Sequence, residues 1–304
     1  MSRAQWNLIG LILALAVGRV AYDLLVSHHL EQTAALFIGL PAILAIVLAS
    51  TSPARSATGM IIKGMTIALL LAGVVLPEVG LGVVGVVGVG LVCIIFAAPL
   101  FLSVGLVIGL MVGLINFFAK RIKALYVIAI IPFLILSAEG VDDRLAFPRA
   151  ESVTAERVIP VSAAEVERFL SKTPRFDKPL PIGLRLGFPR PVGSAGEGLQ
   201  PGDRRIVHFA SRRGRIRDLT LEVAERDWGM VRFQALLDST HIAEWLQWQE
   251  AEVRWTELDG GHTHVRWTLR YRRRLDPVWY FGPLERIAVQ AAAAYLIDNL
   301  ATPP

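Results

Sequence analysis

The sequence is poor in cysteine and in charge. Its single cysteine, Cys93, lies inside an apolar run. One thiol can form neither a disulfide nor a cysteine-based metal site within the chain, so both are excluded, and the redox compartment stays open. Charged residues make up only 19% of the chain, against 54% hydrophobic residues.

The few charges are distributed unevenly. Of the 31 lysines and arginines, 24 follow Gly140, as do 22 of the 26 acidic residues. The basic excess is therefore small in each part of the chain. Nucleic acid is excluded as a partner, because it would need a one-sided basic face. This uneven distribution of charge predicts an apolar region over residues 1–138, a linker over 139–152 and a second domain over 153–304.

Long apolar runs fill residues 1–138 and predict a transmembrane helical bundle. A spanning helix needs about 20 mostly apolar residues, and its backbone must satisfy its own hydrogen bonds. No small-residue cleavage site follows the first run, so we expect a retained helix rather than a signal peptide. The candidate runs are Trp6–Val26, Ala34–Ser50, Gly59–Leu76, Val79–Phe118 and Ala124–Ala138.

The run Val79–Phe118 leaves the number of spans open between five and six. As one helix it would be about 60 Å long, roughly twice the hydrocarbon core of about 30 Å. Pro99 suits the first turn of a second helix, which favours six spans. The basic cluster Lys120–Lys123 favours five, since it joins Arg3 on the same side only then. We expect six spans in the plasma or inner membrane, with the C-terminal domain in the cytoplasm.

The patterns after residue 152 predict an α+β domain. Ser162 and Glu165 form the sequence signature of a capping box, so a helix follows a short strand over 156–161. The Gly- and Pro-rich stretch 173–202 is expected to be mostly loop. From Arg204 the apolar residues recur with a period of two, which predicts about five antiparallel strands with one wet face.

A last helix is expected to begin at or just after Pro277, and the apolar repeat over Pro283–Leu300 predicts that it is amphipathic and lies outside the bilayer. Two adjacent ions and a short apolar length argue against a membrane span. We expect the helix to pack on the apolar face of the sheet, with its alanines leaving room beneath it. The expected inner residues are Leu284, Ile287, Ala288, Ala291, Tyr295 and Leu296. The expected outer residues are Glu285, Arg286, Gln290 and Asp298.

The order of these elements resembles the helix-grip fold of the SRPBCC superfamily, which includes START, Bet v 1 and polyketide cyclase/dehydrase-like proteins. The stretches that carry the resemblance are "VIPVSAAEVERFL", "GDRRIVHF" and the run from "WTELDGGHTHVRW" to "AAAAYLIDNL". It covers residues 156–301 and none of the apolar region. The resemblance implies a cavity between sheet and helix that holds a hydrophobic small molecule or a lipid.

Four aromatic residues on predicted inward faces are the candidate lining of that cavity. They are Phe233, Trp255, Trp267 and Tyr271. The alternative is that these side chains fill a core, since large aromatics dominate cores. The basic residues Arg212, Arg213 and Arg215 form a hairpin tip that is either solvated or in contact with anionic lipid headgroups.

Signals for catalysis are weak. His262 and His264 share one side of a strand start, but a metal site would need further ligands. No nucleophile motif and no acid–base pair is present. We therefore expect no catalytic residue, no metal and no cofactor.

Three functions remain open. The first is a membrane-anchored module that binds a lipid or a hydrophobic small molecule. The second is a polyketide cyclase-like enzyme that acts on such a molecule in the same cavity. The third is a membrane protein whose second domain recruits a partner protein. The lining of the cavity discriminates among them, because a buried histidine or carboxylate there would favour chemistry.

Overall fold

The computed structural model describes residues 32–39, 42, 99–100, 102–108, 110–111, 131–133, 135–141, 143–185, 188–210 and 216–300. The chain divides into two compact units. The first consists of residues 1–147 and 275–280, and the second of residues 148–274 and 281–304.

The described part of the first unit includes a π-helix, η2 (Ala35–Gly39), and a 3-10 helix, η3 (Asp143–Leu145). A carboxylate oxygen of Glu139 accepts the backbone N–H of Val278 at 2.7 Å. In this unit the first residue of the long C-terminal helix is therefore bonded to a segment far away in the sequence.

The predicted membrane spans lie largely outside the described residues. Trp6–Val26 and Gly59–Leu76 lie there entirely, and so do most positions of the other three runs. Among the residues that the structure describes, no helix has both the length and the apolar character needed to cross a membrane. The choice between five and six spans stays a prediction.

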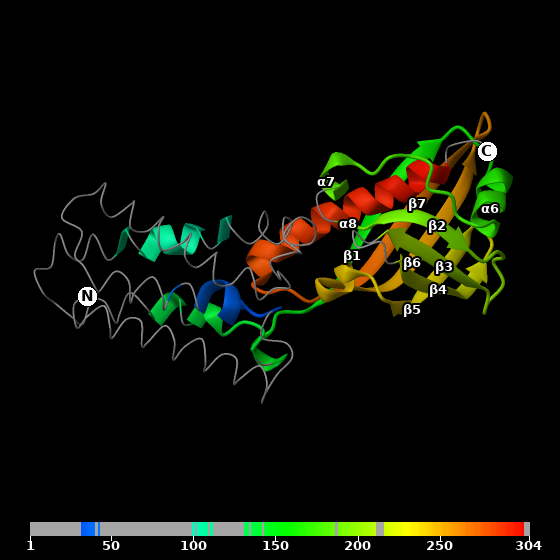
Figure 1. The fold of residues 1–304 in the computed structure, drawn as a ribbon. Helices are drawn as coiled ribbons and strands as arrows, with labels where there is room; N and C mark the ends of the chain where they lie inside the picture. The colour runs from blue at the N-terminus through cyan, green and yellow to red at the C-terminus, as the bar shows by residue number, and fades with distance from the viewer. Residues whose placement is uncertain are drawn as a thin grey trace, which may run out of the picture. The chain divides into compact units, whose positions relative to one another are not determined.

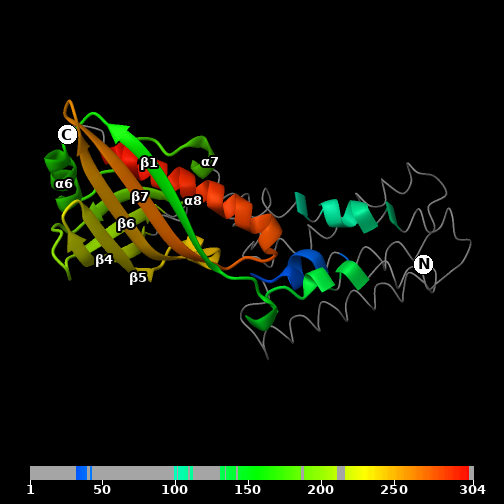
Figure 2. The ribbon, with the colours of Figure 1, turned by 180° about the vertical axis from the view of Figure 1, so that it is seen from behind.

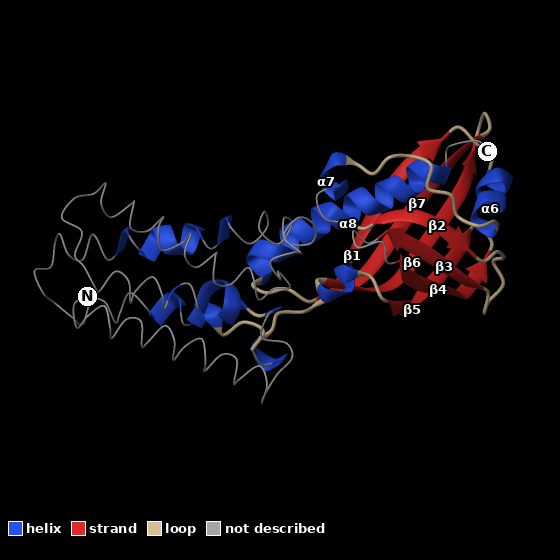
Figure 3. Cartoon of the chain, in the orientation of Figure 1, coloured by secondary structure: helices blue, strands red, loops and turns tan. Residues whose placement is uncertain are grey.

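The second unit is built on one antiparallel sheet of seven strands in the order β1-β7-β6-β5-β4-β3-β2 (Figure 1). The strands are β1 (Ala150–Ile159), β2 (Arg190–Ala195), β3 (Arg204–Ala210), β4 (Ile216–Asp227), β5 (Met230–Asp238), β6 (Leu246–Leu258) and β7 (His262–Arg273). The helical elements are α6 (Ala163–Ser171), α7 (Ile182–Arg185), the 3-10 helix η4 (His241–Glu244) and α8 (Val278–Leu300). The sheet curls, and α8 runs along its concave face (Figures 2 and 3).

The period of two in the last strands sets which face is covered. In β7 the buried residues are Thr263, Val265, Trp267, Leu269, Tyr271 and Arg273, and the residues between them are exposed or half-buried. This confirms the predicted apolar face of the strand. The capping box is also confirmed, since Ser162 Oγ accepts the N–H of Glu165 and the Glu165 carboxylate accepts the N–H of Ser162.

The prediction that residues 173–202 are mostly loop missed a strand and a short helix, β2 and α7. Strand β2 lies at the sheet edge, where Pro191 is tolerated because one side of the strand needs no donor. Its pairing with β3 shifts register between Pro191 and Gly193. The edge strand was therefore missed because its proline and glycine are typical of loops. The first strand was also predicted too short, because residues 150–154 alternate only between exposed and half-buried positions and include a single strongly apolar side chain, Val153.

The predicted inner face of α8 was wrong in part: Tyr295 is buried as expected, but the buried stripe is rotated about the helix axis from the predicted one. Ile287 is 68% exposed, whereas Glu285, which was expected outside, is only 7% exposed. The buried stripe advances four residues at a time. It consists of Phe281, Glu285, Val289, Ala293 and Ile297, with Gly282, Tyr295 and Leu300 beside it. Assigning every charge to the wet side produced the error. The helix begins at Val278, directly after Pro277, as the sequence predicted.

Candidate ligand-binding site

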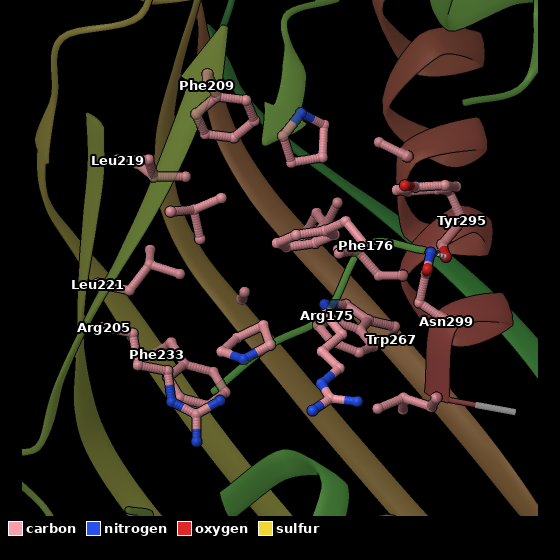
Figure 4. Close-up of a pocket in the computed structure, with 18 of the residues that line it drawn as sticks. Arg175, Phe176, Arg205, Phe209, Leu219, Leu221, Phe233, Trp267, Tyr295 and Asn299 are labelled. Carbon is pink, nitrogen blue, oxygen red and sulfur yellow. Dashed lines mark hydrogen bonds between the residues drawn. The ribbon is translucent and has the colours of Figure 1, made fainter. Parts of the chain in front are cut away.

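A cavity of about 670 Å³ lies between the sheet and the C-terminal half of α8 (Figure 4). Its volume falls in the range of small-molecule sites, about 300–1,000 Å³. Most of its lining is apolar. The sheet supplies Val207, Phe209, Leu219, Leu221, Phe233, Trp248, Trp267 and Leu269; the other elements supply Phe169, Leu170, Phe176, Leu180, Leu184, Phe188, Ile242, Leu296 and Leu300.

Small side chains keep the cavity from closing. Ala235 and Ala251 line it from the sheet, and Ala292 lines it from α8. In the sheet register Ala251 is the partner of Phe233 on one side and of Leu269 on the other. The short side chain thus lies between two large ones, and the opposite helix presents another alanine. This pattern leaves the space that a uniformly large-residue core would fill.

One side of the cavity is closed by the segment Lys172–Pro181, which we call the strap. The strap is bonded to the end of α8: the Lys178 Nζ donates to Asp298 O at 2.6 Å, and Tyr295 Oη donates to Lys178 O at 2.8 Å. The rings of Phe176 and Tyr295 stack with centroids 6.5 Å apart. Ser194 Oγ of β2 donates to Pro174 O. The strap is therefore fixed to both the helix and the edge strand.

Among the described residues that line the cavity, β3 contributes one buried cation. Arg205 is 4% exposed and lines the cavity, and its guanidinium carbon lies 4.9 Å from the centre of the Phe233 ring. Burial lowers the pKa of Arg205 to about 10, and the nearby Asp203 carboxylate opposes that shift. The side chain therefore stays charged at neutral pH.

The four aromatics predicted to line the cavity divide into two pairs. Phe233 and Trp267 line it, whereas Trp255 and Tyr271 lie in the core outside it. Trp255 lies toward the β6–β7 turn, beneath the guanidinium of Arg226 at 5.3 Å. Tyr271 lies toward the other end of β7, in edge contact with Trp248. The alternation of apolar and polar residues predicts which face of a strand is covered. It does not predict which residues along that face line the cavity.

Burial raises the pKa of Tyr271 far above its usual range, and the Glu285 and Glu151 carboxylates raise it further. Its hydroxyl oxygen has no hydrogen-bond partner among the described residues. The side chain is thus a neutral part of the core. The ligand-binding role predicted for these four aromatics stays a prediction.

The remaining residues singled out in the sequence lie away from the cavity or outside the described part of the chain. Arg212, Arg213 and Arg215 are outside the described residues. His264 Nε2 lies 3.3 Å from a Glu156 oxygen, and His262 contacts the carbonyl of Gly260. Within the described ranges no group of three or more histidine, cysteine or acidic side chains could hold a metal ion.

Two features of the site escaped the sequence analysis. Arg205 alternates with Val207 and Phe209 in "RRIVHF", so the pattern already placed it on the apolar face. The strap has no periodic pattern of apolar residues that would predict it. It is held by bonds to α8, which lies more than 110 residues away in the sequence.

No model of a known protein family and no curated protein matches the sequence. Among solved structures the chain is similar to norcoclaurine synthase from Thalictrum flavum, with 11% identity, coverage of 51% of this chain and 94% of that chain, and a TM-score of 0.36. It is also similar to an aromatase/cyclase from Streptomyces sp. R1128, with 12% identity, coverage of 50% and 93%, and a TM-score of 0.34. For the major latex-like protein 151 of Panax ginseng these values are 12%, 49% and 98%, and 0.29.

These similarities carry no conclusion about function. The chain's own sheet order, its curl and the helix on its concave face fit a helix-grip fold.

Tyr271→Phe is expected to leave the free energy of unfolding unchanged or to raise it by up to about 1 kcal/mol, because it removes a buried hydroxyl that has no described partner. Tyr295→Phe is the matched control. It removes the bond to Lys178 O and is expected to lower the free energy of unfolding by about 1 kcal/mol. Denaturant unfolding of the full chain, followed by tryptophan fluorescence, measures both. A larger loss for Tyr271→Phe than for Tyr295→Phe would place a hydrogen bond where we describe none.

Proposed function

We propose that the second unit is a binding module that holds a lipid or another hydrophobic small molecule between its sheet and α8. The observation that carries the proposal is the apolar hollow of about 670 Å³, covered by a strap fixed at both ends. A core made only for stability would be close-packed, because voids forfeit dispersion contacts. The hollow is therefore a feature that stability alone does not explain.

The polar groups of the lining favour binding over catalysis. No histidine is among the described residues that line the cavity. Of its carboxylates, Asp177 and Glu197 are solvent-exposed, and Glu250 forms an ion pair with Arg270 at 2.6 Å. The Tyr295 hydroxyl is used by the strap. The cyclase-like enzyme that the sequence left open would need a poised acid and base, and this lining offers no such pair.

The proposal includes anchoring of this module to the plasma or inner membrane by the apolar N-terminal region. Support comes from the long apolar runs of residues 1–138. An anchored module would exchange its ligand with the bilayer directly, so a hydrophobic ligand would not have to cross water. We propose the cytoplasmic side for the module, because six spans, which the length of Val79–Phe118 favours, place it on the same side as Arg3 and Arg55.

Native mass spectrometry of the full chain, purified in mild detergent, tests the binding function. We expect a hydrophobic molecule to co-purify, and lipid analysis of the extract identifies it. Trp267→Arg is expected to abolish retention, because it places an unpaired charge in the apolar wall. Trp228→Arg is the matched control: Trp228 is 91% exposed at the β4–β5 turn, so the same change there should leave retention at the wild-type level. Wild-type retention in Trp267→Arg would remove the cavity as the binding site.

Cysteine labelling tests the side of the membrane. Cys93 is replaced by serine, and Asp259, exposed at the β6–β7 turn, by cysteine. An impermeant maleimide is expected to label this position only after the cells are permeabilised. Labelling in intact cells would contradict the cytoplasmic placement, and extraction of the chain without detergent would contradict the anchoring itself.

A further inference from the structure

Arg205 is a buried guanidinium whose donors are only partly used. Its Nη2 donates to Leu170 O at the end of α6 and to Gly198 O, the latter at 2.8 Å. Its Nε is buried and donates to no described residue, and no described acceptor lies at Nη1 either. The bond to Leu170 satisfies a carbonyl at a helix C-terminus, where a cation is favourable. That structural role occupies one nitrogen of the three.

The charge of Arg205 is also only partly balanced. It makes no ion pair with any carboxylate in the described part of the chain. The carboxylate of Asp203 opposes the effect of burial on the pKa of Arg205. That carboxylate also accepts the backbone N–H of Gln200 at 2.7 Å. The face of the Phe233 ring lies against the guanidinium. A buried cation with free donors and no opposite charge is costly, and an anion from outside would reduce that cost.

Cations gather where Arg205 lies. Arg168, Lys172 and Arg175 also line the cavity, close in sequence to the α6 carbonyl that Arg205 binds. Arg175 is solvent-exposed and makes no ion pair with a described residue. Figure 4 shows the guanidinium groups of Arg175 and Arg205 at one end of the pocket, with Phe209 and Leu219 toward the other end. The pocket is thus polar at one end, where four lining cations outnumber the nearby carboxylate of Glu197, and apolar at the other.

We propose that the ligand is an amphipathic anion whose acidic group binds the free donors of Arg205, while its apolar body lies against the Phe209–Leu219 end of the cavity. The inference rests on the proposed binding function and adds the class of ligand. A carboxylate and a phosphate monoester offer the same paired anionic oxygens to a guanidinium. A neutral lipid of the same length would fill the apolar end but leave the buried charge uncompensated.

The test compares chains of equal length with different head groups. Hexadecanoate, hexadecyl phosphate and hexadecanol compete with a neutral naphthylamine fluorophore for the full-length protein. We expect the wild type to bind at least one of the two anions about tenfold or more tighter than the alcohol, since a hydrogen bond to a charged group contributes about that factor. Which of the two anions binds tighter distinguishes a fatty acid from a phosphorylated lipid.

Variants of two neighbouring arginines assign the preference to its residue. Arg205→Met is expected to bring anion and alcohol to nearly equal affinity without weakening the alcohol. Arg205→Lys keeps the charge and is expected to fall between wild type and Arg205→Met, which keeps the test valid if the methionine variant does not fold. The control is Arg204→Met: the Arg204 side chain is 67% exposed and pairs with Glu222, so its loss should leave the preference unchanged.

The outcomes separate the two proposals. Equal affinity of the wild type for hexadecanol and both anions would overturn the anionic ligand and leave the binding function standing. Failure of the wild type to bind the fluorophore and all three chains would overturn both. A preference that survives in folded Arg205→Met would overturn the assignment to this arginine.

Discussion

The curled sheet presents an apolar concave face that has to be removed from water, and α8 covers that face without filling it. Along the first half of the helix the contact is close, since Tyr271, Glu285 and Val289 are all buried. Along the second half, alanines on both sides keep the layers apart, and the hollow opens there. The cavity thus follows from where small residues fall on two elements that are far apart in the sequence.

The strap and Arg205 depend on that hollow. The strap would have nothing to enclose if α8 packed directly on the sheet, and its bonds to Asp298 and Tyr295 would then join elements already in contact. Arg205 would be buried among apolar side chains with no space beside its unused donors. Both features are explained by an occupant of the cavity, and the charge of Arg205 makes an acidic occupant the better complement.

Much of this arrangement could be predicted from local patterns. The alternation of β7 gave its buried face, and the capping box gave the start of α6, because these signals depend only on neighbouring residues. The edge strand β2 was missed because proline and glycine at an edge carry no alternation. Glu285 was placed outside because one charge was given more weight than a stripe of four-residue steps.

The site could be predicted only in part, because its extent depends on three-dimensional packing. Alternation placed Trp255, Trp267 and Tyr271 on one face, but only Trp267 lies where α8 stands away from the sheet. The strap could not be predicted from local patterns either, because the residues of α8 that bond to it lie at the far end of the chain. The membrane spans, the cytoplasmic side and the headgroup contacts stay predictions from hydropathy and charge.

The measurement that tests the hollow most directly is the unfolding free energy of two neighbouring substitutions in α8. Ala292 lines the cavity, whereas Ala293 is fully buried in the core beside it. Ala292→Leu should leave stability unchanged or raise it by about 1 kcal/mol, because the added carbons enter empty apolar space, and it should displace the bound molecule. Ala293→Leu should cost about 1–3 kcal/mol by overpacking. Equal losses for both variants, with ligand retention intact, would show that no hollow exists beneath α8.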